Sequence, residues 1–132
     1  MIVEVVGAVI RAADGRVLLV RKAGAPRFTL PGGKREPGED DLTALARELD
    51  EELGVRLVAA ELLGRFEAPA ANEPGATVRS CVYRAEIEGR IAIASEIEAQ
   101  LWVDPARPPE APLAPLLTGQ LLPRLAAETP RP

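Results

Sequence analysis

The chain has 132 residues, of which 47% are apolar and 3% aromatic, and its formal net charge is −4. This length predicts one domain over residues 1–132, with an aliphatic core that needs neither disulfides nor a structural metal. The sequence contains no histidine, which excludes histidine-based triads, zinc–histidine sites and imidazole bases. The acidic balance excludes an electrostatic footprint for duplex nucleic acid, and the single cysteine, Cys81, fits a reducing cytosol.

Two strands are predicted near the N-terminus, over residues 3–11 and 17–22. The residues between them include Asp14 and Gly15, a pair typical of a β-hairpin turn. The first segment carries Glu4 and has neither a basic region nor a small-residue cleavage site, so it is typical of a strand and not of a signal peptide. No apolar run approaches the roughly 20 residues of a membrane-spanning helix. We therefore expect a soluble, cytoplasmic protein without a membrane partner.

The next segment, Phe28-Thr29-Leu30-Pro31-Gly32-Gly33-Lys34, predicts a short strand that breaks into a tight glycine loop. Glycine lets backbone atoms come close to a ligand or metal. The alternative is a plain turn between a strand and a helix.

A helix is predicted from Asp41 to Leu53, with signals at both ends. Asp40 or Asp41 suits the N-cap, and Gly54 stands where a left-handed C-cap is favoured. Leucines at helical spacing predict a buried stripe, made of Leu42, Leu45, Leu49 and Leu53.

The opposite face of this helix carries three carboxylates, on Glu48, Glu51 and Glu52. Like charges this close repel one another and destabilise a helix unless a positive group is present. Arg47 neutralises one of them, and a hard divalent cation such as Mg²⁺ or Mn²⁺, which prefers oxygen ligands, suits the rest. Taken alone, the cluster also fits a solvated acidic helix face.

Several short strands are predicted after the helix. Residues 56–68 form one strand or two short ones, ending at a Pro- and Gly-containing segment, and residues 77–87 form the next. The latter strand places Cys81, Tyr83, Ala85 and Ile87 on one face. The chain then turns toward residues 91–94, and a brief final strand is predicted over residues 101–104.

The C-terminal region predicts a helix interrupted by helix breakers. Gly119 and Pro123 are expected to break or kink it. Its leucines recur at helical spacing: Leu113, Leu116, Leu117, Leu121 and Leu125. The order of elements fits a mixed sheet with one helix on each face.

The loop and the acidic helix together fill every defined position of one motif, G-x5-E-x7-R-E-L-x-E-E-x-G-V, from Gly33 to Val55. Chance would produce it in such a chain with a probability on the order of 10⁻⁶. The chain therefore resembles the Nudix hydrolase family, whose members cleave a diphosphate linked to a nucleoside or other group. The resemblance is sharp over residues 28–55 and generic elsewhere. It implies an α/β fold, the Nudix α/β/α sandwich, with a mixed sheet between the motif helix and a C-terminal helix.

The resemblance also implies a metal site and a reaction. It makes Glu48, Glu51 and Glu52 ligands of Mg²⁺ or Mn²⁺, with Glu48 also the first candidate for the base, and it adds the backbone carbonyl of Gly32 to the site. Water then attacks one phosphorus while cations spread the negative charge.

Three further motif residues receive supporting roles by the same resemblance. Glu39 supports the loop or a metal-bound water, Arg47 holds a glutamate in register, and Gly33 forms the tight loop.

Many Nudix proteins use another acid from a loop outside the motif. Glu96 is the first candidate here and Glu98 the second, and a solvated loop carboxylate is the alternative for both. Trp102 suits packing better than stacking on a base. Candidate contacts to nucleobase or phosphates are Arg21, Arg27 and Phe28.

Three functions are open at this stage. The short chain with F-T-L-P-G-G-K resembles the branch that hydrolyses nucleoside triphosphates, including oxidised ones, to monophosphate and pyrophosphate. Pro69 lies about where ADP-ribose pyrophosphatases carry a proline, so ADP-ribose or a sugar nucleotide stays open. A Nudix-fold binding module without turnover is the third, and the intact glutamates argue against it. Because dimers are common among relatives, a homodimer is also open.

Overall fold

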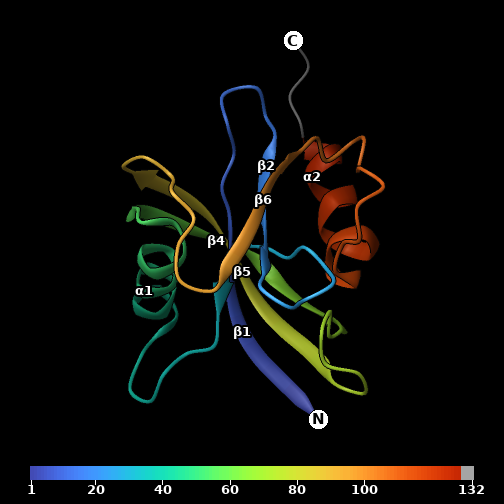
Figure 1. Cartoon of the computed structure of the whole chain (residues 1–132), viewed down its shortest axis with the longest axis horizontal. Helices are drawn as coiled ribbons and strands as arrows, with labels where there is room; N and C mark the ends of the chain where they lie inside the picture. The colour runs from blue at the N-terminus through green and yellow to red at the C-terminus, as the bar shows by residue number, and fades with distance from the viewer. Residues whose placement is uncertain (129–132) are drawn as a thin grey trace.

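A computed structural model describes residues 1–128 and has its strands between two helices (Figure 1). The elements are β1 (Ile2–Val9), β2 (Val17–Lys22), β3 (Gly32–Gly33), α1 (Asp41–Leu53), β4 (Arg56–Pro69), β5 (Thr77–Glu88), β6 (Ile97–Val103), the π-helical turn η1 (Leu117–Leu121) and α2 (Leu122–Glu128). One sheet has the order β3-β1-β5-β4, and β2 pairs with β6. β1 runs parallel to β5, whereas β3 and β4 are antiparallel to their neighbours. The predicted α/β/α architecture with a mixed sheet is confirmed.

The second half of β1, from Val6 to Val9, and the first four residues of β2 are buried on both faces, which explains why their sequences are almost entirely apolar. In β2, Leu18 and Val20 pack with the leucines of α1, while Val17 and Leu19 pack with those of α2. Two aliphatic layers therefore hold one helix on each side of the strands.

Helix α1 begins and ends where the sequence predicts. Asp40 accepts a hydrogen bond from the Thr43 backbone N–H at 2.8 Å, and Gly54 has the left-handed φ of 67° expected of a C-cap. The expected leucine stripe is wrong in one member, because Leu42 is exposed and Ala44 takes its place in the core.

The strands predicted over residues 56–68 and 77–87 are confirmed as β4 and β5. Residues 91–94, toward which the chain was expected to turn, have no regular secondary structure. The N–H groups of Ala92 and Ala94 instead donate to the carbonyls of Leu53 and Glu52, at 2.9 Å each, and so satisfy helix-end carbonyls that lack an intrahelical partner. The final strand is longer than predicted and begins at Ile97.

The strand expected around Phe28 is also absent. Thr29 exchanges backbone hydrogen bonds with Val20, and Phe28 does so with residues 112 and 114. The chain here is extended, but it makes only isolated bridges.

The C-terminal helix continues through both predicted breakers. In η1 the Leu122 N–H donates to the carbonyl of Leu117, five residues earlier. A π-helical turn just ahead of Pro123 accommodates a residue that has no N–H and whose ring crowds the preceding turn. Neither this helix nor any other in the described residues is long and apolar enough to cross a membrane.

Candidate functional site

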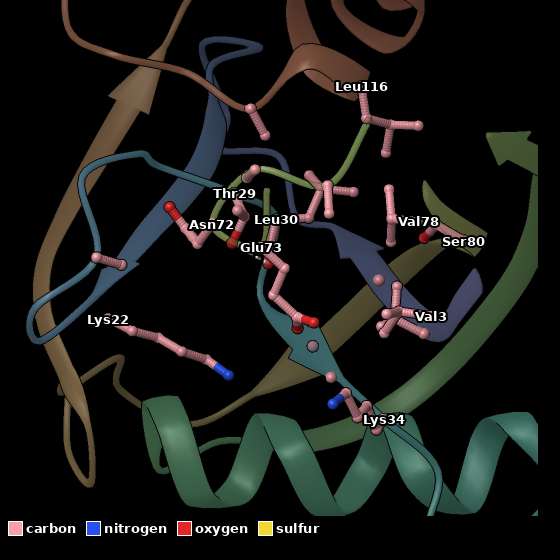
Figure 2. A pocket seen from close by; sticks show the side chains of 18 of the residues that line it. Val3, Lys22, Thr29, Leu30, Lys34, Asn72, Glu73, Val78, Ser80 and Leu116 are labelled. Atoms are coloured by element: carbon pink, nitrogen blue, oxygen red, sulfur yellow. Dashed lines mark hydrogen bonds between the residues drawn. The ribbon is translucent and has the colours of Figure 1, made fainter. Parts of the chain in front are cut away.

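A cleft of about 740 Å³ opens beside the glycine loop. Segments distant in sequence line it: β1, the loop after β2, residues 32–36, the loop after β4, and the start of the C-terminal helix. Figure 2 shows Lys22 and Lys34 at the end next to α1, and Val78, Ser80 and Leu116 at the other end. The cleft therefore has a charged end and an aliphatic end.

The glycine loop lies directly against α1 at the charged end. Gly32 has a φ of 141°, and a Cβ there would be 2.1 Å from the Val6 carbonyl oxygen. A Cβ on Gly33 would lie 2.8 Å from the carboxylate of Glu48. Gly32 accepts no side chain, because the backbone of β1 occupies the space, and a side chain on Gly33 would displace the Glu48 carboxylate.

Glu52 lies beneath this loop and is only 2% exposed. Its Oε1 accepts a hydrogen bond from the Gly32 backbone N–H at 3.1 Å, whereas its Oε2 is buried without a partner among the described residues. Burial raises the pKa of this carboxyl well above its ordinary value, and the neighbouring Glu48 raises the pKa further. The carboxyl is held where its ionisation is unfavourable unless positive charge is added.

Arg47 connects the loop to the acidic face. Its guanidinium donates to both carboxylate oxygens of Glu39, at 2.7 and 2.8 Å, and to the Lys34 carbonyl at 3.1 Å. It also donates to Glu48 at 2.9 Å and to Glu51 at 3.3 Å. The paired hydrogen bonds from Arg47 lower the pKa of the Glu39 carboxyl to about 2. Arg47 therefore contacts the loop, Glu39 and two of the three predicted metal ligands.

The three predicted metal ligands are not equally placed. Glu48 and Glu52 lie together under the loop, but Glu51 is half-exposed and turned to Arg47. Within residues 1–128, no three acidic, histidine or cysteine side chains form a ready-made metal site. The donor set nevertheless fits a hard divalent cation, since it offers carboxylate oxygens, one of them buried without a partner, beside a glycine backbone.

The two candidate acids outside the motif point to different partners. Glu96 follows Ser95, which has a left-handed φ of 58°, and it lines the cleft with its carboxylate 3.2 Å from Lys22 Nζ. Glu98 lies in β6, not in a loop, and pairs with Arg21 at 2.7 Å. Only Glu96 is placed at the charged end of the cleft.

The predicted substrate contacts are only partly brought together. Arg27 lines the cleft. Arg21 and Phe28 do not: the Arg21 guanidinium lies over the Phe28 ring, 5.7 Å from its centre, and Phe28 packs on the core beside α2. Trp102 packs in the core layer beside α1, as the sequence favours.

Several residues that line the cleft were not predicted from the sequence, among them Lys22, Lys34 and Ser80. Lys22 was within reach of sequence reasoning. Residues two apart in a strand share a face, so Lys22 follows Leu18 and Val20 on the α1 side and Arg21 faces the other way. For Ser80 the sequence carried no such signal, because the opposite wall of the cleft comes from distant segments.

Comparisons with known proteins agree with this geometry. A family model described as NUDIX domain matches residues 1–125. A MutT-like protein of Streptomyces ambofaciens is 35% identical over 78% of this chain, which spans only 64% of that protein. The CTP pyrophosphohydrolase of Escherichia coli is 31% identical over 86% of this chain and 84% of its own. An 8-oxo-dGTP diphosphatase of Haemophilus influenzae is 37% identical over about half of each chain.

A solved structure has the same arrangement over nearly the whole length. The MutT NUDIX hydrolase from Burkholderia pseudomallei superimposes with a TM-score of 0.76 at 29% identity, covering 98% of this chain and 99% of that chain.

Proposed function

Because the chain belongs to the Nudix family, we propose that it hydrolyses a nucleoside triphosphate, ordinary or oxidised, to the monophosphate and pyrophosphate. The observation that carries the proposal is the pairing of the buried Glu52 with the half-buried Glu48 under the glycine loop, at the charged end of a cleft large enough for a nucleotide. Hydrolysis of a pyrophosphate bond in a nucleotide agrees with the names of the relatives.

The reaction we propose depends on Mg²⁺ or Mn²⁺. Glu48, Glu52 and the carbonyl of Gly32 would hold the cation, and Glu51 is a fourth ligand candidate. When bound, such a cation neutralises phosphate charge and lowers the pKa of a coordinated water. Its positive charge also favours the ionised form of Glu52, which burial opposes.

The remaining residues at the charged end act on the substrate and the water. Lys22, Arg27 and Lys34 line the cleft and offer positive charge to the phosphates. Glu48 accepts the proton of the attacking water, and Arg47 keeps the Glu48 carboxylate in place through its 2.9 Å contact. Glu96, beside Lys22, is the additional acid of this end.

ADP-ribose or a sugar nucleotide is the second candidate substrate. Pro69 is the last residue of β4 and lines the cleft, and it lies about where ADP-ribose pyrophosphatases carry a proline.

A substrate panel tests this choice. Nucleoside triphosphates, 8-oxo-dGTP, ADP-ribose and a sugar nucleotide are assayed at equal concentration with Mg²⁺ and with Mn²⁺, alongside the Glu52→Gln variant as a blank. We expect the highest kcat/KM on a triphosphate. A higher value on ADP-ribose would transfer the assignment to the second candidate, and binding without turnover of any compound would identify a binding module.

A further inference from the structure

The loop between the glycine loop and α1 is closed by an ion pair that the proposed reaction does not use. Arg35 Nη1 donates to Asp41 Oδ1 at 2.6 Å, so these two side chains join the ends of the loop. Within the loop, the Glu39 N–H donates to the Glu36 carbonyl at 3.0 Å, and the Glu39 carboxylate accepts from the Glu36 N–H at 2.7 Å. Glu39 therefore lies inside a closed loop whose ends Arg35 holds together.

Asp41 is itself bound to the sheet. It is the first residue of α1, and its other carboxylate oxygen accepts a hydrogen bond from the Tyr83 hydroxyl of β5 at 2.6 Å. The hydrogen bond from Tyr83 lowers the pKa of Asp41, and the hydrogen bond from Arg35 lowers it further. Burial and the Asp41 carboxylate raise the pKa of Tyr83 to about 12, so the hydroxyl stays a donor at neutral pH. Asp41 is thus an ionised acceptor with one donor on each oxygen.

Arg35 also contacts β1. Its Nη2 donates to the Glu4 carboxylate at 3.0 Å, so a single guanidinium joins the loop to both α1 and β1. The side chains of Arg35 and Asp41 are 30% and 24% exposed, against 67% and 66% for the surface pair of Arg56 and Glu88. Water and salt therefore weaken the Arg35 contacts less than those of the surface pair.

Neither Arg35 nor Asp41 stands at a defined position of the motif. The bridge between them is therefore a feature of this chain that the motif does not specify.

The segment held by Arg35 leads directly to the candidate metal ligands. The carbonyl of Lys34, the residue before Arg35, accepts a hydrogen bond from Arg47 at 3.1 Å, and Figure 2 shows Lys34 beside α1. Arg47 also donates to Glu39 at 2.8 Å and to Glu48 at 2.9 Å. A loop released at Arg35 would shift the Lys34 carbonyl and Glu39, which are two of the acceptors that orient Arg47.

We propose that Arg35 is a positioning residue of the metal site. By joining the loop to Asp41 and Glu4, it keeps Arg47, and through Arg47 the Glu48 carboxylate, in the orientation that binds the cation. The inference rests on the proposed function, because it takes the cation to lie beside Glu48. Residues that orient metal ligands without touching the metal tune its affinity. The effect of Arg35 should therefore appear in cation binding before it appears in the chemical step.

The test compares Arg35→Ala and Arg35→Lys with wild type and with Arg56→Ala, which removes an exposed arginine outside the cleft. Mn²⁺ is titrated into each metal-free protein, and free Mn²⁺ is followed by electron paramagnetic resonance. We expect Arg35→Ala to raise the Kd for Mn²⁺ by about tenfold, the lower end of the effect of residues that orient metal ligands. A lysine keeps the charge but lacks the planar guanidinium that reaches two carboxylates, so the Kd of Arg35→Lys should be intermediate. Arg56→Ala should bind Mn²⁺ as wild type does.

Two further measurements separate positioning from folding. The thermal midpoint of metal-free Arg35→Ala should stay within about 4 °C of wild type, because a partly exposed ion pair contributes little to stability. With the best nucleoside triphosphate, kcat/KM of Arg35→Ala should fall about tenfold at limiting Mn²⁺ and recover to within about twofold of wild type at saturating Mn²⁺. Excess cation does not correct a variant that is inactive because it is misfolded.

Equal Mn²⁺ affinity of Arg35→Ala and wild type would overturn the inference, as would an equal loss of affinity in Arg56→Ala. If Arg35→Ala does not fold, wild-type affinity in Arg35→Lys would overturn it instead. Failure of wild type to hydrolyse any triphosphate would overturn the proposed function, while the Mn²⁺ titration would still decide the role of Arg35. Absence of Mn²⁺ binding by wild type would overturn both.

Discussion

At the scale of single residues, Glu52 is where burial and charge conflict most directly. One carboxylate oxygen accepts the Gly32 N–H, and the other is buried without a partner in the described part of the chain. The adjacent Glu48 adds negative charge and raises the Glu52 pKa further. A bound cation would pair with the buried oxygen and offset the negative charge of Glu48. Glu52 therefore lowers the stability of the metal-free protein but suits the proposed reaction.

Replacing Glu52 by Gln should therefore separate stability from activity. The amide keeps an acceptor for Gly32 and removes the buried charge, so the metal-free protein should gain about 1 kcal/mol, or about 4 °C in thermal midpoint for a domain of this size. Turnover should fall at least tenfold, about 1.4 kcal/mol of barrier. Asp50→Asn, an exposed acid of the same helix, is the matched control and should change neither quantity. A fully active Glu52→Gln would show that α1 is not the catalytic element.

The paired hydrogen bonds from Arg47 to Glu39 should make the stability of the protein depend on pH. Arg47 lowers the Glu39 pKa from an ordinary value of 4.5 to about 2. A carboxyl whose pKa is lower in the folded state stabilises the fold above its unfolded pKa and loses that contribution as pH falls through the folded value. Wild type should therefore be more stable than Glu39→Gln at pH 7, and the difference should shrink between about pH 4.5 and pH 3.

Urea unfolding of both proteins across this pH range is the measurement. Glu88→Gln, which breaks the exposed ion pair with Arg56, is the control and should change stability less. A stability difference between wild type and Glu39→Gln that stays constant down to pH 3 would show that the ionised Glu39 does not stabilise the fold through Arg47.

At the scale of elements, the sequence predicted the helix ends that are fixed by residues close to them in the chain. The bounds of α1 follow from Asp40 and Gly54, whose cap contacts lie within a few residues. Residues 91–94 could not be placed in this way, because their N–H groups pair with the end of a helix about 40 residues earlier. Nor does the sequence say that a π-helical turn would carry the last helix past Pro123.

The start of β6 at Ile97 separates the two candidate acids outside the motif. It leaves Glu96 in the turn facing Lys22 and places Glu98 in the strand beside Arg21. We expect Glu96→Gln to lower kcat at saturating metal well below that of Glu98→Gln, which serves as the matched control. Equal rates for Glu96→Gln and wild type would leave water activation to Glu48 and Glu52.

At the scale of the whole molecule, the fold builds one continuous cleft from segments that the sequence keeps apart. The charged end comes largely from the motif. Helical spacing predicted that Glu48 and Glu52 are neighbours, and the family resemblance added Arg47 and Glu39. The aliphatic end joins β1, β5 and the C-terminal helix, and no local pattern in the sequence brings Ser80 toward Leu116. The contacts at the charged end were therefore predictable from one short stretch, whereas the lining of the other end depends on the packing of distant segments.

The most direct test of the central claim is the product and cation dependence of one reaction. Wild-type protein stripped of metal is incubated with its best nucleoside triphosphate, first in excess EDTA and then with added Mg²⁺, and the products are followed by phosphorus NMR. We expect no turnover in EDTA, and equal amounts of monophosphate and pyrophosphate once Mg²⁺ is present. Full activity in EDTA, or release of orthophosphate and the nucleoside diphosphate, would contradict this claim.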